Sequence, residues 1–264
     1  MQSIETLKLK LEDTTLTALE RINCLIRLSA ESMQLNKEEA MQYNKQADEL
    51  SIALPKNSIE HGLILNNYGV YYYLVNLNEL ALEKFIAADK ILSQSENIEH
   101  HILSKADIAL IYTRTEQYQQ ALDIYLKIEQ EIKDIPISIR HAQIYINIDA
   151  AYVYLKDYEN ALRYSLKALE ITLRENHHFG KCISYVNSGG NYLQLGNIEK
   201  AKEFIDTAYQ LSSEHNIESL KCSIHQKYAE YYAKTHAYDK AVENGLKAMQ
   251  FAEAQKSEEQ IMFL

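Results

Sequence analysis

An alanine that recurs at every fortieth position constrains this chain more than any other feature of its sequence. The spacing is constant over four steps and is carried by Ala81, Ala121, Ala161, Ala201 and Ala241. Ala40 precedes the first of them by one position more than this period, and a tyrosine stands nine positions before each of the five. Self-similarity of this length at a fixed period predicts an array of stacked structural units.

Each unit contains two helical patterns separated by a short polar link. The residue three before the repeated tyrosine is small in four of the five units, as Gly69, Ala109, Gly189 and Ala229. Residues three apart share one face of a helix, so the small residue allows a close approach and the tyrosine fills the space beside it. With only 7 glycines and 2 prolines in 264 residues, the composition also favours an all-α chain.

The pattern resembles that of the tetratricopeptide repeat family. Gly189, Tyr192, Ala201 and Ala208 stand at the spacing of the family's motif, and Gly196 stands at its turn glycine. The resemblance implies a right-handed α-solenoid of antiparallel helix pairs, a tetratricopeptide superhelix. The units are longer than the family's common length, and in this they resemble those of bacterial regulatory and signalling proteins.

We therefore expect three segments along the chain. Residues 1–20 form an N-terminal capping helix, residues 21–254 form six helix pairs, and residues 255–264 begin an incomplete seventh unit. The last segment reads KSEEQIMFL after a glutamine and ends on an apolar run. We interpret it as the start of a further repeat, which indicates either a continuing chain or a surface that pairs with a second copy.

The first helices of such units line a concave groove, as the resemblance implies. Two residues before each small position stand Asn67, Asp107, Asn147, Asn187 and Lys227. An asparagine amide both donates and accepts hydrogen bonds, so a row of them suits the backbone of an extended peptide. Asp107 cannot donate, and Lys227 suits a carboxylate instead. Alternatively, the asparagines bond to the neighbouring unit and hold the array together.

Apolar side chains at groove-facing spacing would add anchors for such a peptide. Three net hydrogen bonds contribute roughly 1.5–4.5 kcal/mol, whereas micromolar affinity needs roughly 8 kcal/mol. The candidate anchors are Val70, Tyr73, Leu110, Ile146, Val153, Val186 and Leu193. The predicted site is therefore a partly apolar groove for an extended or helical protein segment.

Asp149 is an anomaly, because it occupies the small-residue position of the fourth unit. A buried carboxylate without a partner is costly. We expect either that the helix adjusts and exposes it or that it finds a partner such as a tyrosine hydroxyl.

The sequence contains no motif for catalysis, metals or cofactors. HExxH, CxxC, GxxxxGK[ST] and GxSxG are all absent. His61, His101 and His141 recur with the same period, too far apart to share one ion, and we interpret them as solvated link residues. The formal net charge of −10 disfavours nucleic acid and anionic membranes as partners. Three scattered cysteines and no signal or membrane-spanning segment fit a cytoplasmic location.

These observations favour a non-enzymatic scaffold over a catalyst. The leading hypothesis is a protein- or peptide-binding module, the sensory or regulatory region of a larger bacterial signalling protein. Chains that resemble this one stand ahead of a diguanylate cyclase, a histidine kinase or a transcription regulator. The alternatives are a stand-alone peptide receptor or adaptor and a homo-oligomerisation module, a homodimer formed through the incomplete C-terminal repeat.

Overall fold

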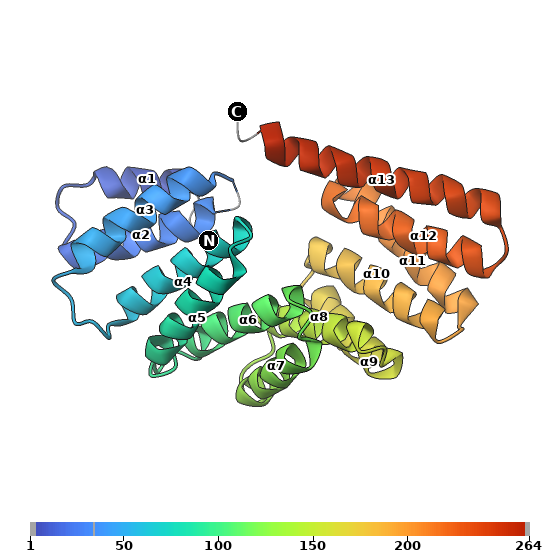
Figure 1. Ribbon diagram of the computed structural model, residues 1–264, viewed down its shortest axis with the longest axis horizontal. Coiled ribbons are helices and arrows are strands. Elements are labelled where there is room, and N and C mark those ends of the chain that lie inside the picture. The colour runs from blue at the N-terminus through green and yellow to red at the C-terminus, as the bar shows by residue number, and fades with distance from the viewer. Residues whose placement is uncertain (1–3, 34, 262–264) are drawn as a thin grey trace. The chain divides into compact units, whose positions relative to one another are not determined.

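The chain is helical throughout the part that the structure describes. The computed structural model describes residues 4–33 and 35–261, with His101 and residues 255–261 described by their backbone alone. Within these residues it contains thirteen α-helices and a short 3-10 helix, and no strand (Figure 1). The chain divides into two compact units, Met1–Ile124 and Tyr125–Leu264. The expected all-α class is confirmed.

After α1 (Ile4–Glu12), the described helices alternate between first and second members of six pairs. The first helices are α2 (Ala18–Ser32), α4 (Ile59–Leu74), α6 (Ile98–Arg114), α8 (Ile139–Tyr154), α10 (His178–Gln194) and α12 (Lys221–Lys234). The second helices are α3 (Lys37–Ser51), α5 (Asn78–Leu92), α7 (Tyr118–Ile132), α9 (Tyr158–Arg174), α11 (Ile198–Glu214) and α13 (Tyr238–Ile261). The 3-10 helix η1 (Glu218–Leu220) leads into α12.

Short polar side chains cap the starts of several helices. The Thr17 hydroxyl accepts a hydrogen bond from the Glu20 amide, and the Glu20 carboxylate accepts one from the Thr17 amide, which completes a capping box. Ser58, Asp157 and Asn197 accept hydrogen bonds in the same way at the starts of α4, α9 and α11.

Two of the periodic histidines are structural. His61 contacts the Ser51 and Ser58 hydroxyls through its two ring nitrogens, at 3.2 and 3.1 Å. His141 is 5% exposed, and its Nε2 lies 3.1 Å from the carbonyl oxygen of Ile132. Their interpretation as solvated link residues is therefore wrong: they join the start of a first helix to the end of the preceding second helix.

A residue with left-handed backbone ends the first helix of each of the last five pairs. These residues are Asn76, Glu116, Lys156, Gly196 and His236, with φ between 59° and 81°. Their numbers advance in equal steps, so the turn repeats with the period of the sequence. Gly196 suits this conformation best, because a side chain disfavours positive φ.

The small residues of the repeat allow close helix packing, as predicted. A Cβ atom on Gly69 would lie 2.5 Å from the Phe85 ring, and one on Gly189 would lie 2.9 Å from Ile205. The repeated alanines Ala81, Ala161 and Ala201 are fully buried. Each glycine is therefore needed because a large apolar side chain of the paired helix occupies the space of its Cβ.

The three consecutive tyrosines of α4 have different surroundings. Tyr72 packs against the buried cluster that contains Phe85, and the ring of Tyr71 meets the edge of Tyr72 at 5.8 Å. Tyr73 lies under the Arg114 guanidinium, whose Cζ is 3.3 Å from the ring centroid. The repeat therefore accounts for Tyr72, while a cation–π contact to the next first helix holds Tyr73.

The end of the described chain continues α13. Residues 255–261, which the sequence assigns to a seventh unit, extend this helix without a break, and residues 262–264 lie outside the described part. None of the helices described here is both long and apolar enough to cross a lipid bilayer.

Candidate functional site

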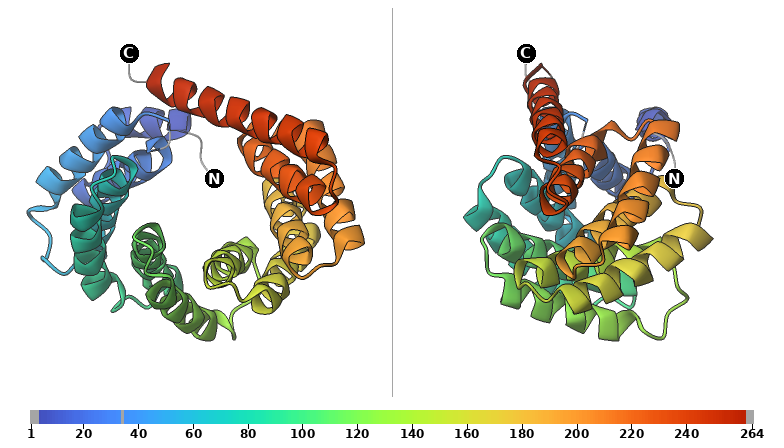
Figure 2. Two further views of the ribbon diagram at one scale, coloured as in Figure 1. Left: turned by 45° about the vertical axis from the view of Figure 1, so that its right-hand side comes forward. Right: turned by 90° about the vertical axis from the view of Figure 1, so that its right-hand side faces the viewer.

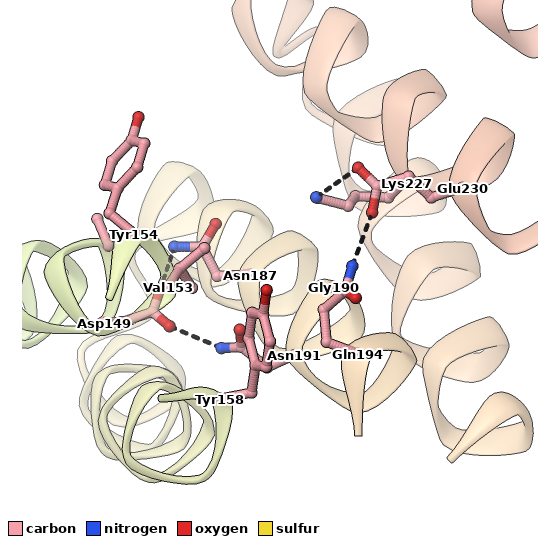
Figure 3. Close-up of a pocket in the computed structure, with 11 residues that line it drawn as sticks. Asp149, Val153, Tyr154, Tyr158, Asn187, Gly190, Asn191, Gln194, Lys227 and Glu230 are labelled. Atoms are coloured by element: carbon pink, nitrogen blue, oxygen red, sulfur yellow. Dashed lines mark hydrogen bonds and ion pairs between the residues drawn. The ribbon is translucent and has the colours of Figure 1, made fainter. Parts of the chain in front are cut away.

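The second unit contains a pocket at the faces of three successive first helices. Its volume is about 300 Å³. The side chains that line it come from α8, α10 and α12, with Tyr158 at the start of α9 (Figure 3). The predicted residues Val153, Asn187 and Lys227 lie together here. These three are far apart in the sequence, and the repeat period brings them to one place.

Asp149 forms the polar floor of this pocket. It is 1% exposed, and its two carboxylate oxygens accept hydrogen bonds from Asn187 Nδ2 at 2.7 Å and Asn191 Nδ2 at 2.6 Å. The expectation that the helix exposes this residue is wrong. The alternative, that it finds a partner, is confirmed, although the partners are amides rather than a tyrosine hydroxyl. The amides come from α10, so they also link α8 to the next pair.

A second polar layer supports Asn191. The Ser165 hydroxyl of α9 accepts hydrogen bonds from Ser188 Oγ at 3.0 Å and Asn191 Nδ2 at 3.4 Å. Asp149 and Ser165 occupy the repeat positions that Gly69 and Phe85 fill in the second pair. The fourth pair therefore has two polar side chains where the second pair has a glycine packed against an aromatic ring.

Burial controls the protonation of Asp149. Removal from water raises the pKa of this carboxyl to about 7, against the opposing effects of the Asn191 and Asn187 amides and of Lys227. The carboxyl therefore exchanges its proton near neutral pH.

Lys227 lies on the opposite side of the pocket. Its Nζ donates to Glu230 Oε1 at 2.8 Å, and Glu230 Oε2 also lies 3.5 Å from Gln194 Nε2. The stem of Lys227 crosses Gly190, where a Cβ atom would lie 3.0 Å from Lys227 Cε. The glycine therefore allows the lysine to lie flat across α10.

The other predicted groove residues do not join this pocket. In the first unit, Asn67 is buried and donates to the carbonyl oxygen of Ile26 at 3.0 Å, which favours the structural interpretation of this asparagine. Asp107 accepts a hydrogen bond from Asn66 Nδ2 at 2.9 Å. Asn147 lies on α8, half-buried, and among the described residues its side chain has no hydrogen-bond partner.

The predicted apolar anchors fall into two groups. Val186 and Leu193 are 3% and 0% exposed, so their prediction as groove-facing anchors is wrong. Val186 belongs to a core cluster with Cys182 and Ile205, because its face of α10 meets the paired helix. The half-buried anchors are Val70, Tyr73, Leu110, Ile146 and Val153.

Sequence reasoning missed several pocket residues. Asn191, Gln194, Glu230, Tyr154 and Tyr158 all line the pocket. The signal that could have found Asn191 is its position on the same face of the helix as Asn187, one turn later. Among the described residues, no cluster of three or more histidine, cysteine or acidic side chains could hold a metal ion.

The architecture and these motifs define a protein of the tetratricopeptide type, built as a helical-repeat array. Residues 140–214 match the model of a tetratricopeptide repeat family. Regulatory protein RapK of Bacillus subtilis (strain 168) is 25% identical over 144 residues, which cover 53% of this chain and 38% of RapK. The matched region spans less than two fifths of each of the three curated relatives compared.

Two solved structures have the same fold. A Rap protein complexed with competence and sporulation factor has a TM-score of 0.74 at 19% identity, over 95% of this chain and 71% of that one. A signal transduction ATPase with a tetratricopeptide repeat sensor, from Pyrococcus horikoshii, has a TM-score of 0.69 at 18% identity. That likeness covers 96% of this chain and 39% of the ATPase.

Proposed function

We propose that this chain is a non-catalytic regulatory scaffold that binds an extended peptide or protein segment across α8, α10 and α12. The arrangement of Asp149, Asn187 and Lys227 carries the proposal. It combines a fixed hydrogen-bonding group and a cation on opposite sides of one pocket. The first helices that present these groups are the ones that the sequence predicted to form the binding face.

The pocket has a donor and an acceptor for a peptide. Because Asn187 donates its amide to Asp149, its carbonyl oxygen points away from that carboxylate (Figure 3). A peptide N–H can donate to this oxygen, and a peptide carboxylate can replace Glu230 as the partner of Lys227. Val153 and Ala150 provide the apolar wall beside them.

The similar proteins support a role in regulation. A protein of this fold has been crystallised with competence and sporulation factor, and the curated relative RapK is a regulatory protein. These likenesses support a regulatory role in which the array binds a partner, and the pocket around Asp149 is our assignment of where it binds.

We also propose that the chain is the sensory region of a larger bacterial signalling protein. The support for a sensory region is that the Pyrococcus horikoshii ATPase has a tetratricopeptide repeat sensor. The support for a bacterial protein is that the regulatory protein RapK comes from Bacillus subtilis. The reading frame beyond the codon of Leu264 tests this part. A catalytic or DNA-binding domain there would support it, and an immediate stop codon would favour a stand-alone receptor.

Selection from a random peptide library tests the site. Peptides that bind the immobilised chain are measured by fluorescence anisotropy against wild type, Asn187→Ala, Lys227→Met and Asn147→Ala. We expect a loss of about two- to tenfold for Asn187→Ala, which removes one neutral hydrogen bond, and of about tenfold or more for Lys227→Met, which removes a charge-assisted one. Asn147→Ala is the matched control, because Asn147 occupies the same repeat position as Asn187 and lies outside the pocket.

Two results would contradict the assignment. Equal binding to wild type and to the Asn187 and Lys227 variants would show that the peptides bind elsewhere. An equal loss in all three variants would favour a row of asparagines over the pocket. Circular dichroism of each variant checks that the fold is retained.

A further inference from the structure

The last described helix pair has an uncovered groove between α12 and α13. Figure 2 shows these two helices side by side in both views. The end groove has a volume of about 320 Å³, and most of its lining residues are small or apolar: Cys222, Ala229, Gly245, Ala248, Met249 and Ala252. No described atom of a neighbouring segment lies within 4 Å of the place where a Cβ on Gly245 would be, so the groove is open at its centre.

The preceding pair shows what covers a surface of this kind. Its corresponding residues stand one period earlier and are Cys182, Ile205 and Ala208, all of them 1% exposed or less. They belong to one core cluster with three large apolar residues of the following helix and its lead-in: Leu220, Ile224 and Tyr228. The repeat therefore uses this surface to receive a row of apolar side chains from another helix.

Beside the end groove, α13 carries an apolar stripe. Val242, Leu246 and Met249 are 63%, 55% and 60% exposed, and their spacing places them along one side of the helix. Side chains of this size and spacing are the kind that cover the corresponding surface of the preceding pair, and the end groove has no such cover. One surface thus presents both a row of apolar side chains and a groove able to receive such a row.

The helix α13 continues past the groove to Ile261 and does not turn back over it. From Gly245 to Ile261, α13 extends about 24 Å away. The self-complementary surface favours a helix from a second copy of this chain as the occupant of the groove.

Charge along α13 is compatible with such a pairing. Glu243 and Lys247 form an ion pair at 2.7 Å beside the stripe. Each copy therefore carries a positive and a negative charge beside the stripe. Two antiparallel copies of α13 can then meet without bringing only like charges together.

We propose that α12 and α13 form a homodimer interface in which the apolar stripe of each copy enters the end groove of the other. The end groove shares Glu230 with the pocket around Asp149, and the residues changed in the test below belong to the groove or the stripe and not to that pocket.

Sedimentation velocity of the whole chain across a wide range of protein concentration tests the proposal. The mass should rise from 30.5 kDa toward twice that value. Leu246→Glu changes the stripe and Ala252→Glu changes the groove. Each should raise the dimer dissociation constant at least about a hundredfold, because the change occurs in both copies.

Leu173→Glu is the matched control, since Leu173 is 48% exposed on α9 and lies outside this surface. It should leave the dissociation constant unchanged. A wild-type mass of 30.5 kDa at every concentration would overturn the proposal. If Leu246→Glu dissociates the dimer but Ala252→Glu has no effect, the role of the groove is overturned. If Leu173→Glu weakens the dimer as much as these variants do, the location of the interface is overturned.

Discussion

The two compact units each contain a carboxyl group that is held by asparagine amides of another first helix, but they hold it differently. In the first unit, Asp107 of α6 has one amide partner, Asn66 of α4. In the second unit, Asp149 of α8 has two amide partners from α10, and Lys227 contributes to its electrostatics. Burial nevertheless raises both pKa values to about 7.

At both sites, neutral amides orient a carboxyl group without making its charge favourable. One amide or two leave the carboxyl with a pKa near neutrality, because the loss of water is the largest effect at both sites. What distinguishes the sites is their surroundings. Asp149 lies at the floor of a pocket with a cation across it, and this is why we place the function there.

The largest expected effect is on the pH dependence of stability. The unfolded chain loses each proton near the ordinary pKa of 3.8, whereas the folded chain keeps it up to about 7. Stability is therefore greatest below the unfolded pKa and falls as the pH rises, with a slope of up to about 1.4 kcal/mol per pH unit for each group. Above the folded pKa the contribution levels off.

Urea denaturation at a series of pH values measures this slope. Asp149→Asn should remove one of the two contributions, and the double variant with Asp107→Asn should remove both. A slope that neither Asp149→Asn nor the double variant changes would show that the protons are held elsewhere.

Truncation of the carboxyls should separate the two sites. At a pH of about 5, Asp149→Ala should lower the free energy of unfolding by about 2–4 kcal/mol, because it leaves two buried amides without an acceptor. Asp107→Ala leaves one amide without an acceptor and should lower the free energy of unfolding by about 1–2 kcal/mol. Chemical denaturation of both variants gives the values, and an equal or larger cost at Asp107 would reverse the ranking.

The asparagines of the row should also differ between the units. Asn67→Ala removes a buried hydrogen bond to Ile26 and should cost about 1–2 kcal/mol of unfolding free energy. Asn147→Ala should cost less than about 0.5 kcal/mol, the usual limit for a side chain away from such features. Thermal and urea unfolding of these two variants check this. A large loss of unfolding free energy in Asn147→Ala would show that Asn147 has a structural role.

The smallest effect concerns the cation. Lys227→Met should raise the pKa of Asp149, since Lys227 favours the charged form of that carboxyl. The pKa of Asp107 should stay the same, because no cation contributes to it. Carbon-detected NMR titration of the two carboxyl groups resolves both values. If the pKa of Asp149 is unchanged in Lys227→Met, solvent screens the charge of Lys227 from this carboxyl.

Much of the fold could be predicted from the sequence because the repeat uses residue size. Gly69, Gly189 and the periodic alanines can be recognised since each allows an approach that a larger residue would block. The same register shows that Asp149 is unusual, because it stands at a small-residue position. The register does not show which side chains bind it. Asn187 and Asn191 lie 38 and 42 residues away, and which amide reaches the carboxyl depends on the rotation of α10.

The failures have a common physical cause. The spacing of Val186 and Leu193 predicts that they lie on the binding face, yet both are buried. Spacing alone does not determine where one face of a helix ends and the next begins. A small rotation of the helix about its axis decides whether a side chain meets the paired helix or the pocket. The register of the repeat is more reliable than the orientation of a single side chain within it.

The left-handed turn residues make the array modular. Asn76, Glu116, Lys156, Gly196 and His236 share one backbone conformation despite their different side chains. A junction that keeps its shape across five unrelated residues allows one whole repeat to be removed, duplicated or exchanged without changing how the next begins. Such an array can change in length and in binding specificity independently, because the turns set the spacing and the first helices carry the chemistry.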